Sequence, residues 1–191
     1  MLVESPQRQA LIEDIRLLDR LTGSVLDQRR LAQPGALRRE LVSLHPWLKT
    51  VIEPWTSRPL LNLETCLEGR NVTASIDPAR WEQVVNNLLE NTIKHKNSEI
   101  AEVVVTLFTP PACEEGVFVL EVADRGPGVP EEQLSQLGEP FFQVDQSRNQ
   151  TAEGFGLGLS LVKGIIEAHE GGFTAKNLKP HGLSIVLRCP Y

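Results

Sequence analysis

The sequence predicts an α/β fold preceded by one helix of the bundle type. Over residues 6–32, apolar side chains recur at alternating spacings of four and three, which is typical of a coiled coil or a helical bundle. From residue 36 to residue 191, short runs rich in Val, Ile and Leu alternate with helical patterns, as in an α/β domain. Gln33-Pro34-Gly35 separates the two regions, because Pro and Gly end helices. We therefore divide the chain into residues 1–35 and residues 36–191.

The expected N-terminal helix carries a single apolar stripe, while most of its charged residues lie on other faces. The stripe consists of Leu11, Ile15, Leu18, Thr22 and Val25. A single helix cannot bury such a stripe by itself, so a partner helix is expected. The alternative is a helix that folds back on the domain that follows it. We favour the bundle, because the spacing is that of a helical seam.

In the second region the patterns predict alternating strands and helices. A helix is expected to begin after Asp77, an N-cap residue followed by Pro78 at the first helical position, and to run to about His95. Two hairpins are expected, one from 102–108 with 117–123 and one from 171–178 with 183–189. Residues 138–154 lack periodicity and are expected to form a mobile loop. The other expected strands are 39–44, 59–67 and 71–76, and the other expected helices are 46–56 and 156–170.

Composition and charge exclude several classes of function. The formal net charge is −6, and the longest basic runs are pairs of arginines, so no nucleic-acid partner is expected. The sequence has no apolar run of about 20 residues and no signal peptide, so we expect no membrane contact by this chain. The three cysteines, Cys66, Cys113 and Cys189, are far apart and predict reduced thiols, with no zinc site or disulfide framework.

The first segment whose side chains could bind a ligand is the expected helix VVNNLLENTIKH, residues 84–95. Asn87 and Asn91 lie one turn apart beside the apolar face, and Lys94 is close to them. Amide oxygens are hard ligands that suit Mg²⁺, and an ammonium group attracts phosphate. This strip therefore predicts a magnesium-phosphate site. The alternative is an ordinary solvated strip on an amphipathic helix.

Two glycine-containing turns follow. Asp124-Arg125-Gly126-Pro127-Gly128-Val129 comes directly after a strand, where a carboxylate can accept a hydrogen bond from an exocyclic amine such as that of adenine. Glycines there let the backbone approach a flat ring closely. The alternative is a simple Gly-Pro turn.

The second glycine-rich segment, Gly154-Phe155-Gly156-Leu157-Gly158-Leu159, leads into a helix, whose N-terminus favours phosphate. It follows a polar loop and lacks Gly-Lys-Ser/Thr, so neither a dinucleotide fingerprint nor a Walker loop is present.

In this order the segments resemble the ATP-binding domain of bacterial sensor histidine kinases, which belongs to a superfamily shared with gyrase, Hsp90 and MutL. NNLLENTIKH is similar to the N box, DRGPGV to the G1 box, EPFFQVD to the F box and GFGLGLSLVKGIIEAHEGG to the G2 box. The resemblance covers roughly residues 38–191. LLDRLTGSVLD in residues 1–35 resembles the second helix of the dimerisation and phosphotransfer hairpin. The implied fold is a two-layer α/β sandwich of the Bergerat type, with a mixed sheet covered by helices.

The resemblance also implies a role for individual residues. Asn91 would bind Mg²⁺ with Asn87 in support, and Asp124 would recognise the adenine of ATP. Phe141 and Phe142 would anchor the lid or pack in the core. The full set of residues expected to hold the nucleotide is Asn87, Asn91, Lys94, His95, Asp124, Gly126, Gly128, Val129, Arg148, Gly154, Gly156, Leu157, Gly158, Leu159 and Ser184, of which Lys94 and Arg148 would contact phosphate.

The sequence also departs from the family pattern. Gln143 stands where many relatives have arginine, Thr92 replaces a common alanine and His95 replaces a common Tyr or Phe. None of the four histidines lies in the His-Glu/Asp-x-x-x-Pro pattern of an acceptor helix, so the acceptor histidine is expected upstream of Met1. His45 and His169 are expected to be structural or exposed.

The reaction expected from the resemblance is transfer of the γ-phosphate of Mg-ATP to that histidine, for relay to a response-regulator aspartate. Gyrase-like ATPases have a water-activating glutamate one turn before the metal-binding asparagine, where this chain has Asn87. An ATP hydrolase, a serine-directed kinase and a non-catalytic nucleotide-responsive module remain alternatives. The expected partners are a second copy, through the helical hairpin, and a receiver domain. The expected location is the cytoplasmic part of an inner-membrane sensor.

Overall fold

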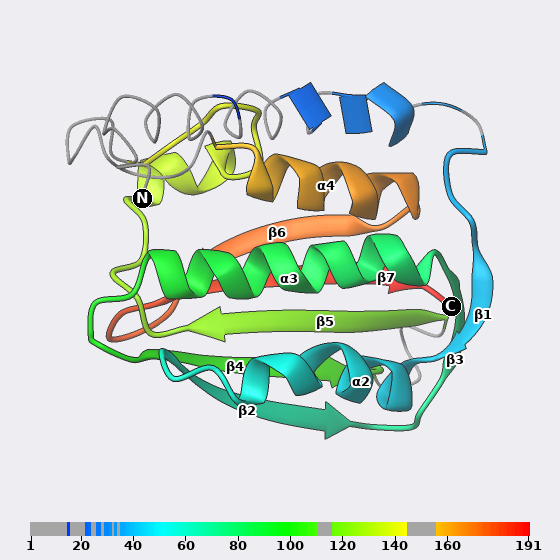
Figure 1. Ribbon diagram of the computed structural model, residues 1–191, viewed down its shortest axis with the longest axis horizontal. Coiled ribbons are helices and arrows are strands. Elements are labelled where there is room, and N and C mark those ends of the chain that lie inside the picture. Colours follow the sequence, from blue (N-terminus) through cyan, green and yellow to red (C-terminus); the bar gives the residue numbers. More distant parts are fainter. Residues whose placement is uncertain are drawn as a thin grey trace, which may run out of the picture.

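The fold is a two-layer α/β sandwich with a mixed sheet on one side and helices on the other, as predicted (Figure 1). The computed structural model describes residues 15, 22–23, 26–27, 29–31, 33, 35–110, 116–144 and 156–191. The helices of the domain are α2 (Leu44–Thr56), α3 (Pro78–Lys94) and α4 (Gly158–Ala168), and η2 (Glu131–Gln136) is a 3₁₀ helix. The strands are β1 (Glu40–Ser43), β2 (Leu61–Glu68), β3 (Thr73–Ile76), β4 (Ala101–Phe108), β5 (Val117–Asp124), β6 (Gly172–Asn177) and β7 (Leu183–Pro190).

The main sheet has five strands in the order β2-β4-β5-β7-β6. Strand β2 pairs with β4 in parallel, and the remaining neighbours are antiparallel. Both predicted hairpins are present, β4 with β5 and β6 with β7. Strands β1 and β3 form a separate antiparallel pair, so residues 69–72, between β2 and β3, connect strands of two different sheets.

The core lies between the sheet and the helices. Trp81 of α3 is fully buried, and its ring contacts the rings of Trp47, Phe118 and His169. The predicted apolar face of α3, which also includes Val84, Val85, Leu88 and Leu89, is buried along its whole length. Because that face is buried, the asparagines of the neighbouring strip, Asn87 and Asn91, are only half-buried.

The start of α3 is formed as the sequence predicted. Asp77 caps the helix, because its side chain accepts a hydrogen bond at 3.1 Å from the backbone N–H of Arg80, and Pro78 is the first helical residue. Such a cap stabilises a helix by about 1 kcal/mol. Oδ2 of the same carboxylate also accepts from the backbone N–H of Arg38 at 2.8 Å, which ties the start of the domain to α3.

The N-terminal helix contacts the domain near its C-terminal end. Leu31 is 8% exposed, and Arg80 forms an ion pair with Asp27 at 3.2 Å. Ile15, which belongs to the predicted stripe, is 51% exposed. The stripe residues Leu11, Leu18 and Val25 lie outside the described residues. Among the described residues of this region, Asp27 and Leu31 thus contact the domain, and the assignment of residues 1–35 to a dimerisation hairpin stays a prediction.

Several element boundaries differ from the predictions by one or two residues, and one short helix was not predicted. Helix α2 begins at Leu44 rather than at 46, α4 spans Gly158–Ala168 within the predicted 156–170, and η2 was not predicted. Most of the predicted loop at 138–154 lies outside the described residues. Within the described ranges, no helix is long and apolar enough to cross a bilayer.

Candidate functional site

The predicted site is assembled where α3 meets the start of α4. Gly158, the first residue of α4, lies against the two asparagines of α3. A Cβ atom placed on Gly158 would lie 3.2 Å from Oδ1 of Asn87 and 3.7 Å from Oδ1 of Asn91. The orientation of Asn87 is set by its amide nitrogen, which donates to the carbonyl oxygen of Gln83 at 2.8 Å. The Asn87 oxygen therefore faces the start of α4.

This arrangement places two amide groups beside a helix N-terminus. The first backbone N–H groups of an α-helix have no intrahelical partner, and the helix dipole makes that end positive. Such an end attracts anions, phosphate above all. Amide oxygens suit Mg²⁺, which keeps most of its other ligands as water and phosphate oxygens. In the part of the chain that the structure describes, no group of three His, Cys, Asp or Glu could hold a metal ion. Two amide oxygens beside a helix N-terminus fit a metal bound together with phosphate.

Asp124 lies at the opposite end of the site, at the end of β5. Its Oδ1 accepts hydrogen bonds from the backbone N–H of Gly126 at 2.7 Å and from that of Leu183 at 3.1 Å. Among the residues that the structure places, Oδ2 has no hydrogen-bond donor. One oxygen therefore fixes the carboxylate, and the other can accept a hydrogen bond from a ligand.

A cavity of about 240 Å³ opens beside Asp124. A side chain at Gly126 would not fit there, because its Cβ would lie 2.9 Å from Oδ1 of Asp124 and 3.0 Å from the backbone oxygen of His95. The absence of a side chain thus lets the backbone pass close to the carboxylate. The lining residues are Thr92, Lys96, Asn97, Ser98, Ala101, Glu102, Asp124, Arg125, Gly126 and His181.

Lys94 and His95 end α3 between the two parts of the site, and both are exposed. The pKa of His95 lies below its usual value, chiefly because the surrounding protein removes water from one side of the ring. Lys94 lowers this pKa further, while Asp124 opposes the shift. A neutral imidazole at neutral pH can lie against an uncharged purine without bringing a positive charge to it.

A backbone hydrogen bond joins Phe141 to Gly156, which lies just before α4. The N–H of Phe141 donates to the carbonyl oxygen of Gly156 at 3.2 Å. Gly156 has φ +66° and packs directly on the backbone of Phe142, so a side chain would be strained and would collide there. Phe141 itself is 59% exposed, which does not fit the alternative of core packing for that ring. Leu157 is buried and Leu159 packs against the core.

The remaining predicted residues fall into three groups. Ser184 is fully buried and donates to Glu121 at 2.5 Å, and Glu121 also pairs with Lys176 at 3.0 Å. Gly128 and Val129 contact Asn177, which the sequence did not single out. A polar residue at a strand end was the only available signal for Asn177. Arg148 and Gly154 lie outside the described residues.

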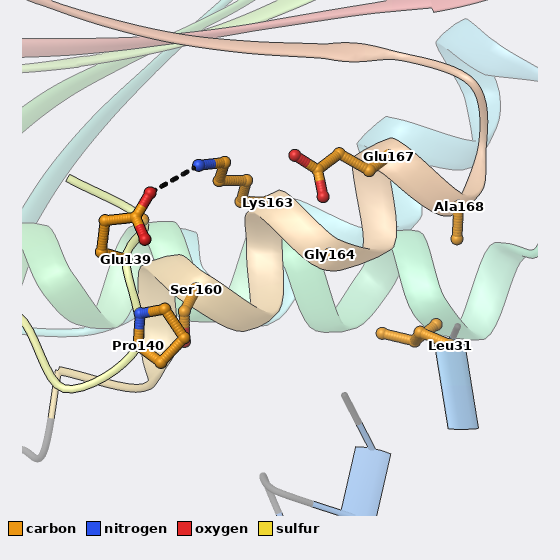
Figure 2. Close-up of a pocket in the computed structure, with 9 residues that line it drawn as sticks. Leu31, Glu139, Pro140, Ser160, Lys163, Gly164, Glu167 and Ala168 are labelled. Carbon is orange, nitrogen blue, oxygen red and sulfur yellow. Dashed lines mark hydrogen bonds and ion pairs between the residues drawn. The ribbon is translucent and has the colours of Figure 1, made fainter. Parts of the chain in front are cut away.

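A larger cavity, of about 480 Å³, lies on another side of α4 (Figure 2). It is bordered by Leu31 of the N-terminal helix, by residues 138–140 and by α4, and Lys163 pairs with Glu139 across it at 3.1 Å. It contains neither the asparagines of α3 nor Asp124, although its Ser160 lies in the first turn of α4. Size alone therefore does not identify the site.

The chain is similar in sequence to a known protein family and to individual sensor kinases. Residues 76–191 match the family described as histidine kinase-, DNA gyrase B- and HSP90-like ATPase. The signal transduction histidine-protein kinase BaeS of Escherichia coli K12 is 34% identical over 171 residues, which cover 86% of this chain and 35% of BaeS. The chain thus spans about a third of the length of this curated relative.

Two solved structures have the same fold. Full-length ShkA in complex with AMPPNP superposes with a TM-score of 0.76 at 24% identity, over 97% of this chain and 39% of that one. The histidine kinase ThkA in complex with the response regulator protein TrrA superposes with a TM-score of 0.73 at 19% identity, over 100% of this chain and 53% of that one. The fold and the order of the sequence boxes agree with the family match. The chain therefore belongs to the histidine kinase-, DNA gyrase B- and HSP90-like ATPase family, with an ATP-binding domain of the sensor histidine kinase type.

Proposed function

We propose that this chain binds Mg-ATP between α3, the start of α4 and Asp124, and presents the γ-phosphate to a histidine supplied by a dimerisation and phosphotransfer domain. The observation that carries the proposal is the approach of Gly158 to Asn87 and Asn91, by which the positive end of a helix lies beside two amide oxygens, a type of ligand that suits Mg²⁺. The AMPPNP complex of ShkA, which contains an ATP analogue, supports the same ligand.

Each end of the site has a distinct task in this proposal. Asn91, with Asn87 beside it, holds the metal, and Lys94 contacts phosphate. Oδ2 of Asp124 accepts the exocyclic amine of adenine, while Oδ1 stays bonded to the backbone. Gly126 and Gly128 let the loop pass close to the base, and Arg148 reaches the γ-phosphate from the lid. Bound Mg²⁺ would neutralise charge on the phosphate oxygens during transfer.

The residues of α3 favour transfer over hydrolysis. Asn87 has no basic group, and its amide nitrogen is bonded to Gln83. Glu90 is exposed, and adjacent positions on a helix point about 100° apart, so its carboxylate is directed away from Asn91. No carboxylate of α3 is therefore positioned to activate water. Phosphoryl transfer needs chiefly positioning and charge stabilisation, with the acceptor imidazole as the nucleophile.

The partners follow from this reaction. The ThkA complex with a response regulator supports a receiver domain as the final acceptor. We further propose that residues 1–35 belong to a helical hairpin that pairs with a second copy. We also propose that the domain is the cytoplasmic part of an inner-membrane sensor, because ATP is available in the cytoplasm.

A reconstitution assay tests the proposal. The chain is mixed with radiolabelled ATP, Mg²⁺ and a separate dimerisation and phosphotransfer domain that carries an acceptor histidine. We expect acid-labile phosphohistidine on that domain, none when the acceptor histidine is replaced, and none with Asn91→Ala. Steady release of phosphate without transfer would instead support the ATP hydrolase. Nucleotide binding with neither reaction would support the non-catalytic module.

A further inference from the structure

Asn177, the last residue of β6, bonds to both backbone groups of Val129. Its Oδ1 accepts from the Val129 N–H at 2.9 Å, and its Nδ2 donates to the Val129 carbonyl oxygen at 2.6 Å. We propose that Asn177 is a positioning residue for nucleotide binding, one that acts on the base through the loop from Asp124 to Val129. This inference rests on the proposed function, because it assumes that Asp124 recognises the base.

The orientation of the Asn177 amide is determined by its partners. Its Nδ2 also donates to a carboxylate oxygen of Glu131 at 3.0 Å. Both partners on that side, a carbonyl oxygen and a carboxylate, can only accept, whereas the Val129 N–H on the other side can only donate. One amide orientation satisfies all three hydrogen bonds. A carboxylate at this position would lack the donor and would face Glu131 with a like charge.

The β6–β7 hairpin holds the loop at both of its ends. Asn177 fixes Val129 from the end of β6, and the backbone N–H of Leu183 fixes Oδ1 of Asp124 at 3.1 Å from the start of β7. The hairpin turn itself is closed by a hydrogen bond from the Leu178 N–H to the Gly182 carbonyl oxygen at 2.9 Å. Gly182 packs directly on the backbone of Asp124. The position of the base-recognising carboxylate therefore depends on this hairpin.

Gly128 shows how closely the amide fits the loop. A Cβ there would lie 2.9 Å from Oδ1 of Asn177, and the residue has φ +74°, which favours glycine. With the amide of Asn177 in place, only glycine fits at 128. Without Asn177, the N–H and carbonyl groups of Val129 lose their partner, and the loop loses its restraint at the Val129 end, so that only the Asp124 end stays fixed.

Calorimetric titration of the whole chain with Mg-ATP and with Mg-ADP tests the inference. We expect Asn177→Ala to raise the Kd of both nucleotides about tenfold with an unchanged ratio between them, because the base is common to both. Asn177→Asp should bind at least as weakly as Asn177→Ala. Asn71→Ala is the matched control, since Asn71 also bridges backbone and side chain, by accepting from the His45 N–H at 3.0 Å and donating to Ser43 at 2.8 Å, but lies outside the site.

The outcomes separate the two proposals. If the wild-type chain binds neither nucleotide, the proposed function fails. If it binds both, the inference is overturned when Asn177→Ala binds like wild type, when Asn71→Ala loses as much affinity, or when the ATP-to-ADP ratio changes. Should Asn177→Ala fail to fold, hydrogen exchange in the wild-type chain decides. Bound Mg-ADP should then slow exchange of the Val129 N–H, and an unchanged rate overturns the inference.

Discussion

The imidazole of His169 accepts a hydrogen bond through Nε2 from the backbone N–H of Asp77 at 3.0 Å. Its Nδ1 lies 2.8 Å from the carbonyl oxygen of Ile165, to which it donates. Because the Asp77 N–H can only donate, Nε2 must be unprotonated and the ring neutral. The ring is 2% exposed and joins the end of α4 to the start of α3. These two helices carry the asparagines and Gly158 of the candidate site.

Acid should therefore destabilise the chain through His169. The pKa of His169 lies below its usual value, chiefly because burial disfavours the charged ring; Arg39 acts in the same direction, while the bond to Ile165 and the charge of Asp77 oppose it. Unfolded histidine takes up a proton near pH 6.5, whereas the folded ring stays neutral to lower pH. The unfolded state then binds more protons, so the free energy of unfolding falls as the pH drops below about 6.5.

Urea unfolding at pH 7.5 and at pH 5 measures this effect. We expect His169→Gln to be less stable at neutral pH by about 1–3 kcal/mol, because the bond of the ring to the Ile165 carbonyl oxygen and its contact with Trp81 are lost, and to show a weaker pH dependence than wild type. His181→Gln, at an exposed position, should keep the wild-type dependence. An unchanged pH dependence in His169→Gln would refute the assignment of a neutral, buried ring.

Gly158→Ala should separate binding from stability. The new Cβ would lie 3.2 Å from Oδ1 of Asn87, in the space assigned to phosphate and metal, so we expect Mg-ATP affinity to fall about tenfold or more. The thermal midpoint should change little, because the higher helix propensity of alanine offsets the close contact with Asn87. Gly164→Ala on the same helix is the control, since its Cβ would meet only Leu31, at 3.8 Å. Wild-type affinity in Gly158→Ala would remove the start of α4 from the site.

Asp124→Asn should weaken recognition of adenine while leaving the fold intact. The amide oxygen can still accept from Gly126 and Leu183, but an NH₂ group replaces the second oxygen and cannot accept the adenine amine. We expect affinity for ATP to fall by about tenfold to a hundredfold, with less preference over GTP, in a fluorescence competition assay. Glu102→Gln, in the same cavity, should bind ATP like wild type. Equal ATP affinity in both variants would count against Asp124 as the base-recognising residue.

The ion pair between Asp27 and Arg80 should contribute measurably to docking of the N-terminal helix. Both side chains are mostly buried, at 25% and 23% exposure, and the guanidinium contacts both carboxylate oxygens at 3.2 Å. A double-mutant cycle with Asp27→Ala and Arg80→Ala should give a coupling of about 1 kcal/mol in denaturant unfolding. The pair of Arg39 with the exposed Glu170 should give less. A coupling of zero for Asp27 and Arg80 would mean that this contact does not hold the helix.

Local signals in the sequence predicted the parts of the site that lie within single elements. Asp77 and Pro78 predicted the start of α3, and helical periodicity predicted that Asn87 and Asn91 lie on one strip of that helix. The position of Asp124 followed from the end of a strand pattern. Each of these features depends on neighbouring residues along the chain, which is why no knowledge of the fold was needed.

Contacts between distant segments could not be predicted in this way. Strand β2 pairs in parallel with β4, which is distant in the sequence. The strand patterns alone do not determine this pairing, because they also allow a hairpin between β2 and β3. The bonds of Asn177 to Val129 join residues 48 positions apart, and the partner of Ser184 is Glu121 on the neighbouring strand. A single polar residue at the end of a strand carries too little information to name its partner.

The most direct test of the central claim is a crystal structure of this chain with Mg²⁺ and a non-hydrolysable ATP analogue. We expect the adenine amine within hydrogen-bond distance of Oδ2 of Asp124, the metal on the side-chain oxygen of Asn91, and the phosphates beside Gly158. Density for the analogue in the cavity between α4 and the N-terminal helix, or no density at saturating concentration, would contradict this claim.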